Sequence, residues 1–204
     1  MPSPTTAARR ARTRPAGVPS PWQMFFTEFL KHPVMVGSIV PSSDKLIRKM
    51  LGRVDWDNTK VFVEYGPGVC TFCRPILDRM APDATLIVID TNPDFIRYLR
   101  HTITDPRFSA VLGSAADVEK IVADHGFESA DYVLSGLPFS TLPPGVGPAI
   151  AAGTHSVLRT GGAFLVYQFS PKVKDFLIPH WQRIDHDMEW WNVPPAQLYW
   201  AWKD

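Results

Sequence analysis

The sequence predicts an α/β domain in which a mostly parallel sheet carries helices on both faces. Apolar, β-branched runs of strand length alternate with stretches of helix length along most of the chain, which is typical of parallel sheets. Two further apolar runs near the end, separated by a proline-containing segment, predict a closing antiparallel hairpin. With 204 residues, 45% of them hydrophobic, the chain can bury one full core.

The predicted elements follow one another in a regular order. An apolar stretch from Trp22 to Leu30 predicts a short helix, with Pro21 in its first turn and His32-Pro33 after its end. Ser42-Ser43 caps a second helix that runs to about Leu51. The predicted strands are Val61–Tyr65, Leu86–Asp90, Phe108–Leu112, Tyr132–Ser135 and Ala163–Phe169. The later helices cover 71–80, 93–101, 115–124 and 146–158, and the hairpin strands are Asp185–Trp191 and Gln197–Trp202.

Residues 1–20 differ in composition from the rest of the chain. They are rich in Pro, Ala, Ser, Thr and Arg and contain almost nothing to bury, so we expect a disordered tail followed by one domain over residues 21–204. The formal net charge of +1 includes four arginines of this tail, and without them 17 basic residues face 20 acidic ones. A mildly negative domain is unlike a nucleic-acid-binding surface, so no nucleic-acid partner is expected.

Other sequence features bear on the compartment. No apolar run approaches the roughly 20 residues that cross a bilayer, and no short apolar segment follows the N-terminal arginines as it would in a secretory signal. The two cysteines, Cys70 and Cys73, predict neither a disulfide scaffold nor a zinc site. We therefore expect a cytoplasmic, monomeric protein without a metal.

The segment from Val61 to Cys70 is the most informative part of the sequence. A strand-like run ends in Glu64-Tyr65, and Gly66 and Gly68 follow before a helix-like segment. The next strand-like run ends in Asp90. A loop without side chains lets its backbone approach a ligand, and an acid at the end of the second strand can accept hydrogen bonds from ribose hydroxyls. The pattern predicts a nucleotide-type cofactor site at the carboxyl ends of parallel strands.

The chain resembles the class I S-adenosylmethionine (SAM)-dependent methyltransferases over roughly residues 22–203. Within that class it is similar to the bacterial phospholipid N-methyltransferases, which are related to the rRNA adenine dimethyltransferases. The resemblance rests on five blocks, 29–43 (Phe-Leu-Lys-His-Pro-Val-Met-Val-Gly-Ser-Ile-Val-Pro-Ser-Ser), 64–68 (Glu-Tyr-Gly-Pro-Gly), 89–95 (Ile-Asp-Thr-Asn-Pro-Asp-Phe), 135–140 (Ser-Gly-Leu-Pro-Phe-Ser) and 191–196 (Trp-Asn-Val-Pro-Pro-Ala). It implies a Rossmann-like sheet, with residues 21–52 forming N-terminal lid or membrane helices.

The resemblance also implies which residues contact SAM. The methionine moiety would lie near the glycine loop, the ribose at the end of the second strand, and the adenine beside residues 113–117. The cofactor-binding residues that follow are Glu64, Gly66, Pro67, Gly68, Asp90, Thr91, Ser114 and Ala115. Ser114 stands where the family tends to have an aspartate.

Simpler interpretations remain for three of the acids. Glu64 is alternatively a solvent-facing strand end. Asp90 is alternatively a helix cap, although Asn92 is the better cap for a helix that begins near Pro93. Asp117 is either part of the adenine loop or the N-cap of the next helix.

Cys70 is the main departure from the family pattern, because the glycine loop normally has a third glycine there. It also creates a Cys-x-x-Cys sequence with Cys73 directly after a strand, which is where thioredoxin-like oxidoreductases hold a reactive thiol. We keep a thiol redox protein as an alternative, although the chain has no convincing proline segment to face the thiols.

The resemblance places the methyl acceptor beside the loop that follows the fourth strand. Ser135, Leu137, Pro138 and Phe139 are the predicted substrate-binding residues, with backbone carbonyls and an aromatic face toward the acceptor nitrogen. Phe139 is alternatively a core residue. Methyl transfer depends mainly on proximity and alignment, and no side chain is predicted as a catalytic base.

The aromatic residues of the first predicted helix favour a membrane surface. Trp22, Phe25, Phe26 and Phe29 would insert into the interface, and the tail arginines would add attraction to anionic lipids. Alternatively this helix packs over the cofactor cleft. The sequence therefore predicts a peripherally membrane-associated SAM methyltransferase that N-methylates a phospholipid amine such as phosphatidylethanolamine. The alternatives are another acceptor (an RNA adenine or a small molecule) and the thiol redox protein.

Overall fold

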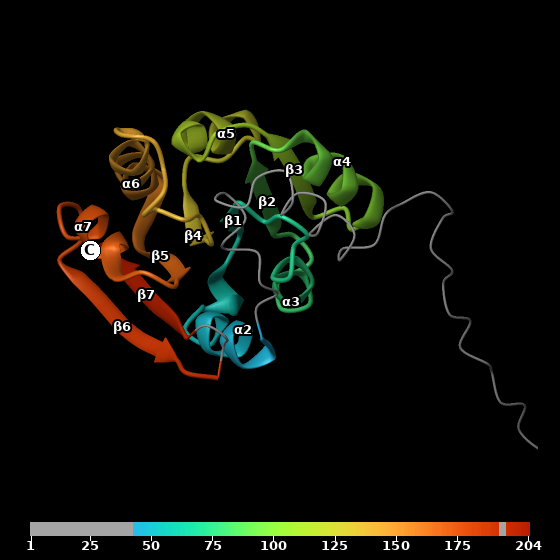
Figure 1. The fold of residues 1–204 in the computed structure, drawn as a ribbon. Coiled ribbons are helices and arrows are strands. Elements are labelled where there is room, and N and C mark those ends of the chain that lie inside the picture. Colours follow the sequence, from blue (N-terminus) through green and yellow to red (C-terminus); the bar gives the residue numbers. More distant parts are fainter. Residues whose placement is uncertain (1–42, 192–194) are drawn as a thin grey trace, which may run out of the picture.

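The computed structural model describes residues 43–191 and 195–204, and a seven-stranded sheet forms its central layer (Figure 1). The strands are β1 (Val61–Tyr65), β2 (Thr85–Asp90), β3 (Phe108–Leu112), β4 (Ala130–Ser135), β5 (Leu158–Gln168), β6 (Arg183–Glu189) and β7 (Ala196–Trp202). Their order is β3-β2-β1-β4-β5-β7-β6. Strands β1 to β5 are parallel, and β7 is antiparallel to both β5 and β6. The predicted parallel sheet with a C-terminal antiparallel hairpin is confirmed.

Helices cover both faces of this sheet. They are α2 (Asp44–Leu51), α3 (Cys73–Leu77), α4 (Pro93–Thr102), α5 (Val118–Asp124), α6 (Val146–Val157) and α7 (Lys174–Leu177), with short 3-10 turns η1 (Trp56–Asn58), η2 (Ala115–Asp117) and η3 (Pro171–Val173). Buried side chains of α2, α3 and α4 share one core cluster with the sheet, and those of α5, α6 and α7 share the other. The sheet is therefore the middle of three layers.

Burial on both faces explains the composition of the central strands. Every residue of β1 and of β4 is buried, and both strands lie inside the sheet. Strands covered on both sides need apolar side chains at successive positions, which is why they appear in the sequence as continuous runs. The edge strand β6 is mostly half-buried and carries charged residues.

Capping residues begin two helices where the sequence predicts them. The Ser43 hydroxyl oxygen accepts a hydrogen bond from Leu46 N at 3.2 Å at the start of α2. The Asn92 carboxamide oxygen accepts from Asp94 N at 2.8 Å at the start of α4, where Pro93 occupies the first turn. These contacts satisfy backbone N–H groups that have no partner within the helix.

Some boundaries differ from the prediction. Helix α3 begins at Cys73 rather than at residue 71, because Cys70 has a left-handed φ of 62° and its N–H bonds Pro67 O in a tight turn. Strand β5 begins at Leu158, five residues earlier than expected. The helix predicted over 22–30, its membrane-facing aromatics and the boundary near residue 20 lie outside the described residues. Across the described part of the chain, no helix is long and apolar enough to cross a bilayer.

The topology gathers several loops at one edge of the sheet. The parallel strands β1 to β5 all end at their carboxyl edge. Gln168 at the end of β5 pairs with Gln197, and Glu189 at the end of β6 pairs with Ala196 at the start of β7. The turn from β6 to β7 therefore lies at the same edge as the loops that follow β1, β2 and β4.

Candidate functional site

The glycine loop after β1 has the backbone that its sequence predicts. Gly66 and Gly68 have φ values of 61° and 53°, a region that side-chain-bearing residues rarely adopt. A Cβ on Gly66 would lie 2.7 Å from Leu137 Cδ2. Glycine is therefore required at position 66 both for the turn and for its close approach to the loop after β4.

Glu64 is enclosed rather than exposed at the end of β1. Its exposed fraction is 2%, so the interpretation as a solvent-facing strand end is wrong. Burial, with a smaller contribution from the negative charge of Asp90, raises the pKa of the Glu64 carboxyl to about 8. A carboxyl with this pKa is poised to ionise when a cation approaches.

The two cysteines lie directly against Glu64. Cys70 and Cys73 are joined by a disulfide, with their Cα atoms 5.3 Å apart. Both sulfurs lie 3.6 Å from Glu64 Oε2, and the three ligand-type side chains gather within 4.8 Å. Cysteine count alone predicted no structural disulfide, and only the fold brings this local bridge onto the carboxyl.

Asp90 joins the end of β2 to the glycine loop. Its carboxylate accepts hydrogen bonds from Gly68 N at 3.3 Å and from Asn92 N at 2.8 Å. Burial raises the pKa of Asp90, and these backbone donors partly oppose the rise. Asn92 rather than Asp90 is the side-chain cap of α4, and Thr91 is exposed beside them.

The loop after β3 lies next to Asp90. Gly113 N donates to the Asp90 backbone carbonyl at 3.0 Å. The Ser114 hydroxyl oxygen accepts from Ala116 N at 3.1 Å, while Ala115 is buried. Asp117 precedes α5 but makes no side-chain capping bond to it. Leu112 of β3 is 52% exposed at this same edge, an apolar surface that the strand pattern did not single out.

The loop after β4 is held by internal hydrogen bonds. The Ser135 hydroxyl oxygen accepts from Leu137 N at 3.2 Å. The Leu137 carbonyl accepts both from Phe139 N at 2.9 Å and from the Gln168 side-chain amide. Since a carbonyl oxygen has two lone pairs, Leu137 O is already used in positioning the loop. Pro138 O is likewise used, by the backbone and hydroxyl of Thr141.

Phe139 adopts the core role rather than an open position. Its exposed fraction is 2%, and its ring centroid lies 5.5 Å from Phe176 and 6.4 Å from Phe164. An aromatic group next to the loop after β4 comes instead from β5. A Cβ on Gly136 would collide with the Tyr167 hydroxyl, so Gly136 leaves room for that side chain. Gln168 and Tyr167 were missed because nothing local marks the end of β5 as the neighbour of the β4 loop.

The structure thus brings Glu64, Gly68 and Asp90 together at the ends of β1 and β2, with Leu137 of the β4 loop against Gly66. The predicted membrane aromatics Trp22, Phe25, Phe26 and Phe29 are not among the described residues. The site therefore combines the buried Glu64 carboxyl, the half-buried Asp90 carboxylate, the glycine loop and the neighbouring loop after β4.

Comparison with known proteins identifies the family, although no family model matches the chain. An ornithine lipid N-methyltransferase from Singulisphaera acidiphila is 33% identical over 178 residues, covering 86% of this chain and 93% of that relative. Among solved structures, a precorrin-6y C5,15-methyltransferase from Geobacter metallireducens superimposes with a TM-score of 0.63 at 14% identity, covering 79% of this chain and 90% of its own. A SAM-dependent O-methyltransferase from Thermotoga maritima gives a TM-score of 0.58 at 12% identity, covering 79% and 66%.

These similarities agree with the sheet order and with the glycine loop, and they show a methyltransferase fold rather than a thioredoxin fold. The chain belongs to the family of the ornithine lipid N-methyltransferase and is a SAM-dependent methyltransferase.

Proposed function

We propose that this methyltransferase N-methylates the primary amine of a membrane-lipid headgroup while bound to the bilayer surface. The relative from Singulisphaera acidiphila is named an ornithine lipid N-methyltransferase, which supports a lipid amine as the acceptor. The structural observation that carries the proposal is an exposed tryptophan pair at the same edge of the sheet as the site. A soluble or RNA acceptor gives no reason for such a pair at this edge of the sheet.

Residues at the edge fit SAM. The glycine loop has no Cβ atoms at Gly66 and Gly68, so its backbone can lie against the ligand. Glu64 would hold the ammonium group of the methionine moiety, and Asp90 would accept hydrogen bonds from the ribose hydroxyls. When bound, SAM supplies a methyl group on a sulfonium.

Trp190 and Trp191, here called the hairpin tip, follow β6 at the carboxyl edge. They are 70% and 77% exposed, the highest values among the large hydrophobic side chains of the described residues. Trp191 N donates to the buried Glu189 carboxylate at 3.1 Å, which fixes the base of the tip. Tryptophan favours the boundary between headgroups and acyl chains, because its ring is apolar and its N–H is polar.

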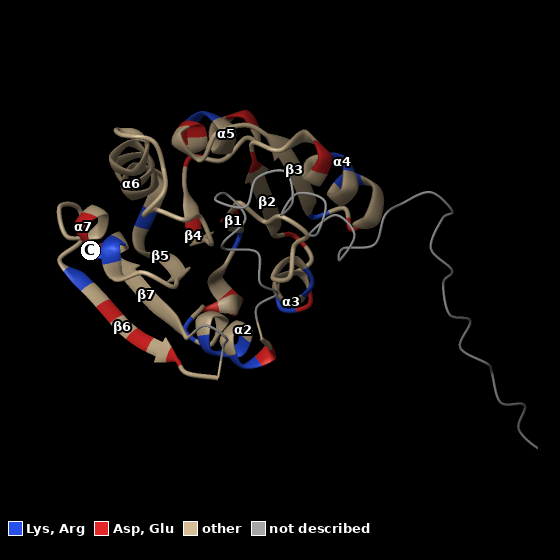
Figure 2. Ribbon diagram, viewed as in Figure 1, with Lys and Arg blue, Asp and Glu red and all other residues tan. Residues whose placement is uncertain are grey.

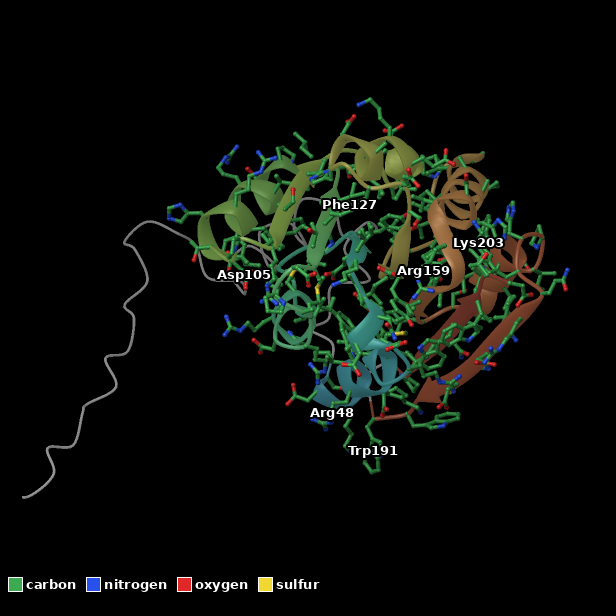
Figure 3. The ribbon with its side chains drawn as sticks, turned by 180° about the vertical axis from the view of Figure 1, so that it is seen from behind. Arg48, Asp105, Phe127, Arg159, Trp191 and Lys203 are labelled. Atoms are coloured by element: carbon green, nitrogen blue, oxygen red, sulfur yellow. A yellow bond between two sulfur atoms is a disulfide. The ribbon has the colours of Figure 1, made fainter. Side chains whose placement is uncertain are left out.

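Basic side chains of α2 accompany the tip. Figure 3 shows Trp191 and Arg48 projecting on the same side of the molecule, and Figure 2 shows the basic positions of α2 close to β6. The Lys45 ammonium lies 4.6 Å from the centre of the Trp191 ring. Lys49 and Arg53 instead pair with Asp187 and Asp185 of β6. An apolar tip beside Lys45 and Arg48 is complementary to an anionic membrane surface.

Methyl transfer requires mainly that the protein align the acceptor amine with the methyl group. The amine must be neutral to attack, and its lone pair must point along the line of displacement. The Gln168 and Phe139 hydrogen bonds to Leu137 O fix the loop against which the amine would lie. With the hairpin tip in the interface, the carboxyl edge would face the headgroups, so a lipid amine need not leave the membrane.

The proposal is tested by incubating the protein with radiolabelled SAM and three kinds of vesicle. One contains phosphatidylethanolamine, one contains ornithine lipid, and one contains only phosphatidylcholine and phosphatidylglycerol. We expect label in the lipid fraction with at least one amine lipid and none with the third vesicle. Labelling of RNA or a soluble amine, with no labelled lipid, would refute the lipid proposal but leave the SAM site in place.

A further inference from the structure

Cys70 is held in a backbone conformation that a cysteine does not favour. Its φ of 62° makes it the one non-glycine residue with a positive φ in the described part of the chain. The left-handed region costs an L-residue roughly 1–2 kcal/mol relative to the right-handed one. The 2.7 Å hydrogen bond from Cys70 N to Pro67 O and the disulfide to Cys73 both hold the turn closed.

The disulfide lies directly against a carboxyl of the proposed donor site. Both sulfurs contact Oε2 of Glu64, the carboxyl proposed to hold the ammonium group of SAM. Glu64 and Cys73 are 2% and 0% exposed, so the sulfurs replace solvent around that oxygen. A disulfide sulfur has no hydrogen to donate and cannot rotate away, whereas two thiols can donate to a carboxylate and change rotamer.

We propose that Cys70 and Cys73 form a reversible thiol–disulfide site within the SAM loop, in which the disulfide hinders Glu64 from binding the donor's ammonium group and the dithiol permits it. The inference rests on the SAM site proposed above and adds a chemical control of that site. It assigns the sulfurs a role in donor affinity, not in the methyl-transfer step.

The exchange needs an external oxidant, a low-molecular-weight disulfide. A thiolate attacks that disulfide and forms a mixed disulfide, releasing one thiol. The second cysteine then attacks the protein-bound sulfur, forms the Cys70–Cys73 bond and releases the second thiol. Two electrons pass to the reagent, and its two sulfurs leave as thiols with the two cysteine protons. Cys70, at 8% exposure, is the more accessible sulfur and is expected to react first, because Cys73 is fully buried.

The test compares donor-product affinity in two verified redox states. The full-length protein is treated with oxidised glutathione or with a phosphine, with a chelator present to prevent metal capture by the dithiol. Thiol alkylation and mass spectrometry establish the state of each cysteine. Calorimetry with S-adenosylhomocysteine should then show at least tenfold tighter binding by the reduced protein. Equal affinities, tighter binding by the oxidised protein, or no binding in either state would overturn the proposal.

Two variants separate this effect from general damage by the oxidant. Cys73→Ser and Cys70→Gly cannot form the bridge, and glycine suits the φ of position 70. Each variant should bind S-adenosylhomocysteine with the same affinity under the two treatments. If both variants retained the wild-type redox dependence, the effect would not come from this disulfide. Lipid labelling is measured separately, so its absence with redox-dependent donor binding would refute the proposed substrate and not this inference.

Discussion

The glycine loop after β1 and the hairpin tip after β6 lie at the same edge of the sheet, but the key side chain at the loop is buried and those at the tip are exposed. The loop encloses Glu64 beneath two sulfurs, whereas Trp190 and Trp191 at the tip are largely exposed. Burial shifts the pKa of a carboxyl and so prepares it for a charged ligand. Exposing large aromatic rings to water costs free energy, and inserting the rings into a membrane interface removes that cost.

The difference implies that donor binding and membrane binding depend on separate parts of one sheet edge. Changes in the glycine loop should alter donor affinity and leave vesicle binding unchanged. Changes at the hairpin tip should do the reverse. Four measurements test whether donor binding and membrane binding separate in this way.

The largest effect is expected from Gly66→Ala. The added Cβ would lie 2.7 Å from Leu137 Cδ2 on a backbone with positive φ, so the loop must shift. We expect a loss of S-adenosylhomocysteine affinity of roughly 100-fold or more, measured by calorimetry, because small displacements of an aligned site are costly. Gly126→Ala is the matched control, since Gly126 also has a positive φ but has open space around its Cβ position. A similar loss of affinity in both variants would show that backbone strain, and not the contact with Leu137, weakens donor binding.

Asp90→Ala should have the next largest effect. It removes the proposed ribose acceptor and leaves Gly68 N and Asn92 N without their partner, at a cost of about 1.5–3 kcal/mol in binding free energy. Asn92→Ala removes the cap of α4 and keeps the Asp90 carboxylate, so it should lower the free energy of unfolding by about 1 kcal/mol with unchanged donor affinity. Unaltered affinity in a folded Asp90→Ala protein would contradict the ribose assignment.

Replacing both tip residues, Trp190→Ala with Trp191→Ala, should weaken membrane binding. If each partly inserted ring contributes about 1 kcal/mol, partitioning onto anionic vesicles falls about thirtyfold in sedimentation assays. Ile178→Ala is the control, because Ile178 is also 64% exposed but follows α7 rather than β6. Donor affinity should stay the same in both proteins. Vesicle binding that survives the double change would place the membrane contact elsewhere.

The smallest effect is a pH dependence of donor affinity. The Glu64 carboxyl, with a pKa of about 8, is mostly protonated below that pH, and it must lose its proton to pair with an ammonium group. Binding then releases a proton, so affinity should rise with pH between 6 and 7.5, by at most about tenfold per unit. Glu64→Gln cannot ionise and should give weaker binding with a flatter profile. A wild-type profile that is flat, or that falls with pH over this range, would argue against contact between Glu64 and the ammonium group.

Local sequence signals determined much of the fold. The strands β1 and β3 match their predicted bounds, and for β1 the reason is that a short apolar run buried on both faces has few alternatives. Ser43 and Asn92 begin their helices as predicted, since capping depends on neighbours in the chain. The glycine loop and the acid that ends β2 were predicted from a local pattern, because a loop that approaches a ligand closely needs glycine, whereas the role of the loop after β4 was implied by the family resemblance.

Tertiary structure alone decided which side chains meet at the site. The burial of Glu64, the two sulfurs on its carboxyl and the bond from Gln168 to Leu137 depend on how loops pack, and no spacing in the sequence encodes that packing. Trp190 and Trp191 looked like ordinary hairpin residues until strand pairing placed them at the carboxyl edge. Local sequence patterns were enough to predict a mostly parallel sheet with a cofactor loop after its first strand, because periodicity and glycine placement act locally, whereas the SAM-dependent methyltransferase class was implied by the family resemblance. The proposed redox control at the donor loop and the proposed membrane contact of the hairpin tip follow only from the fold, because they depend on how loops and strands pack against one another.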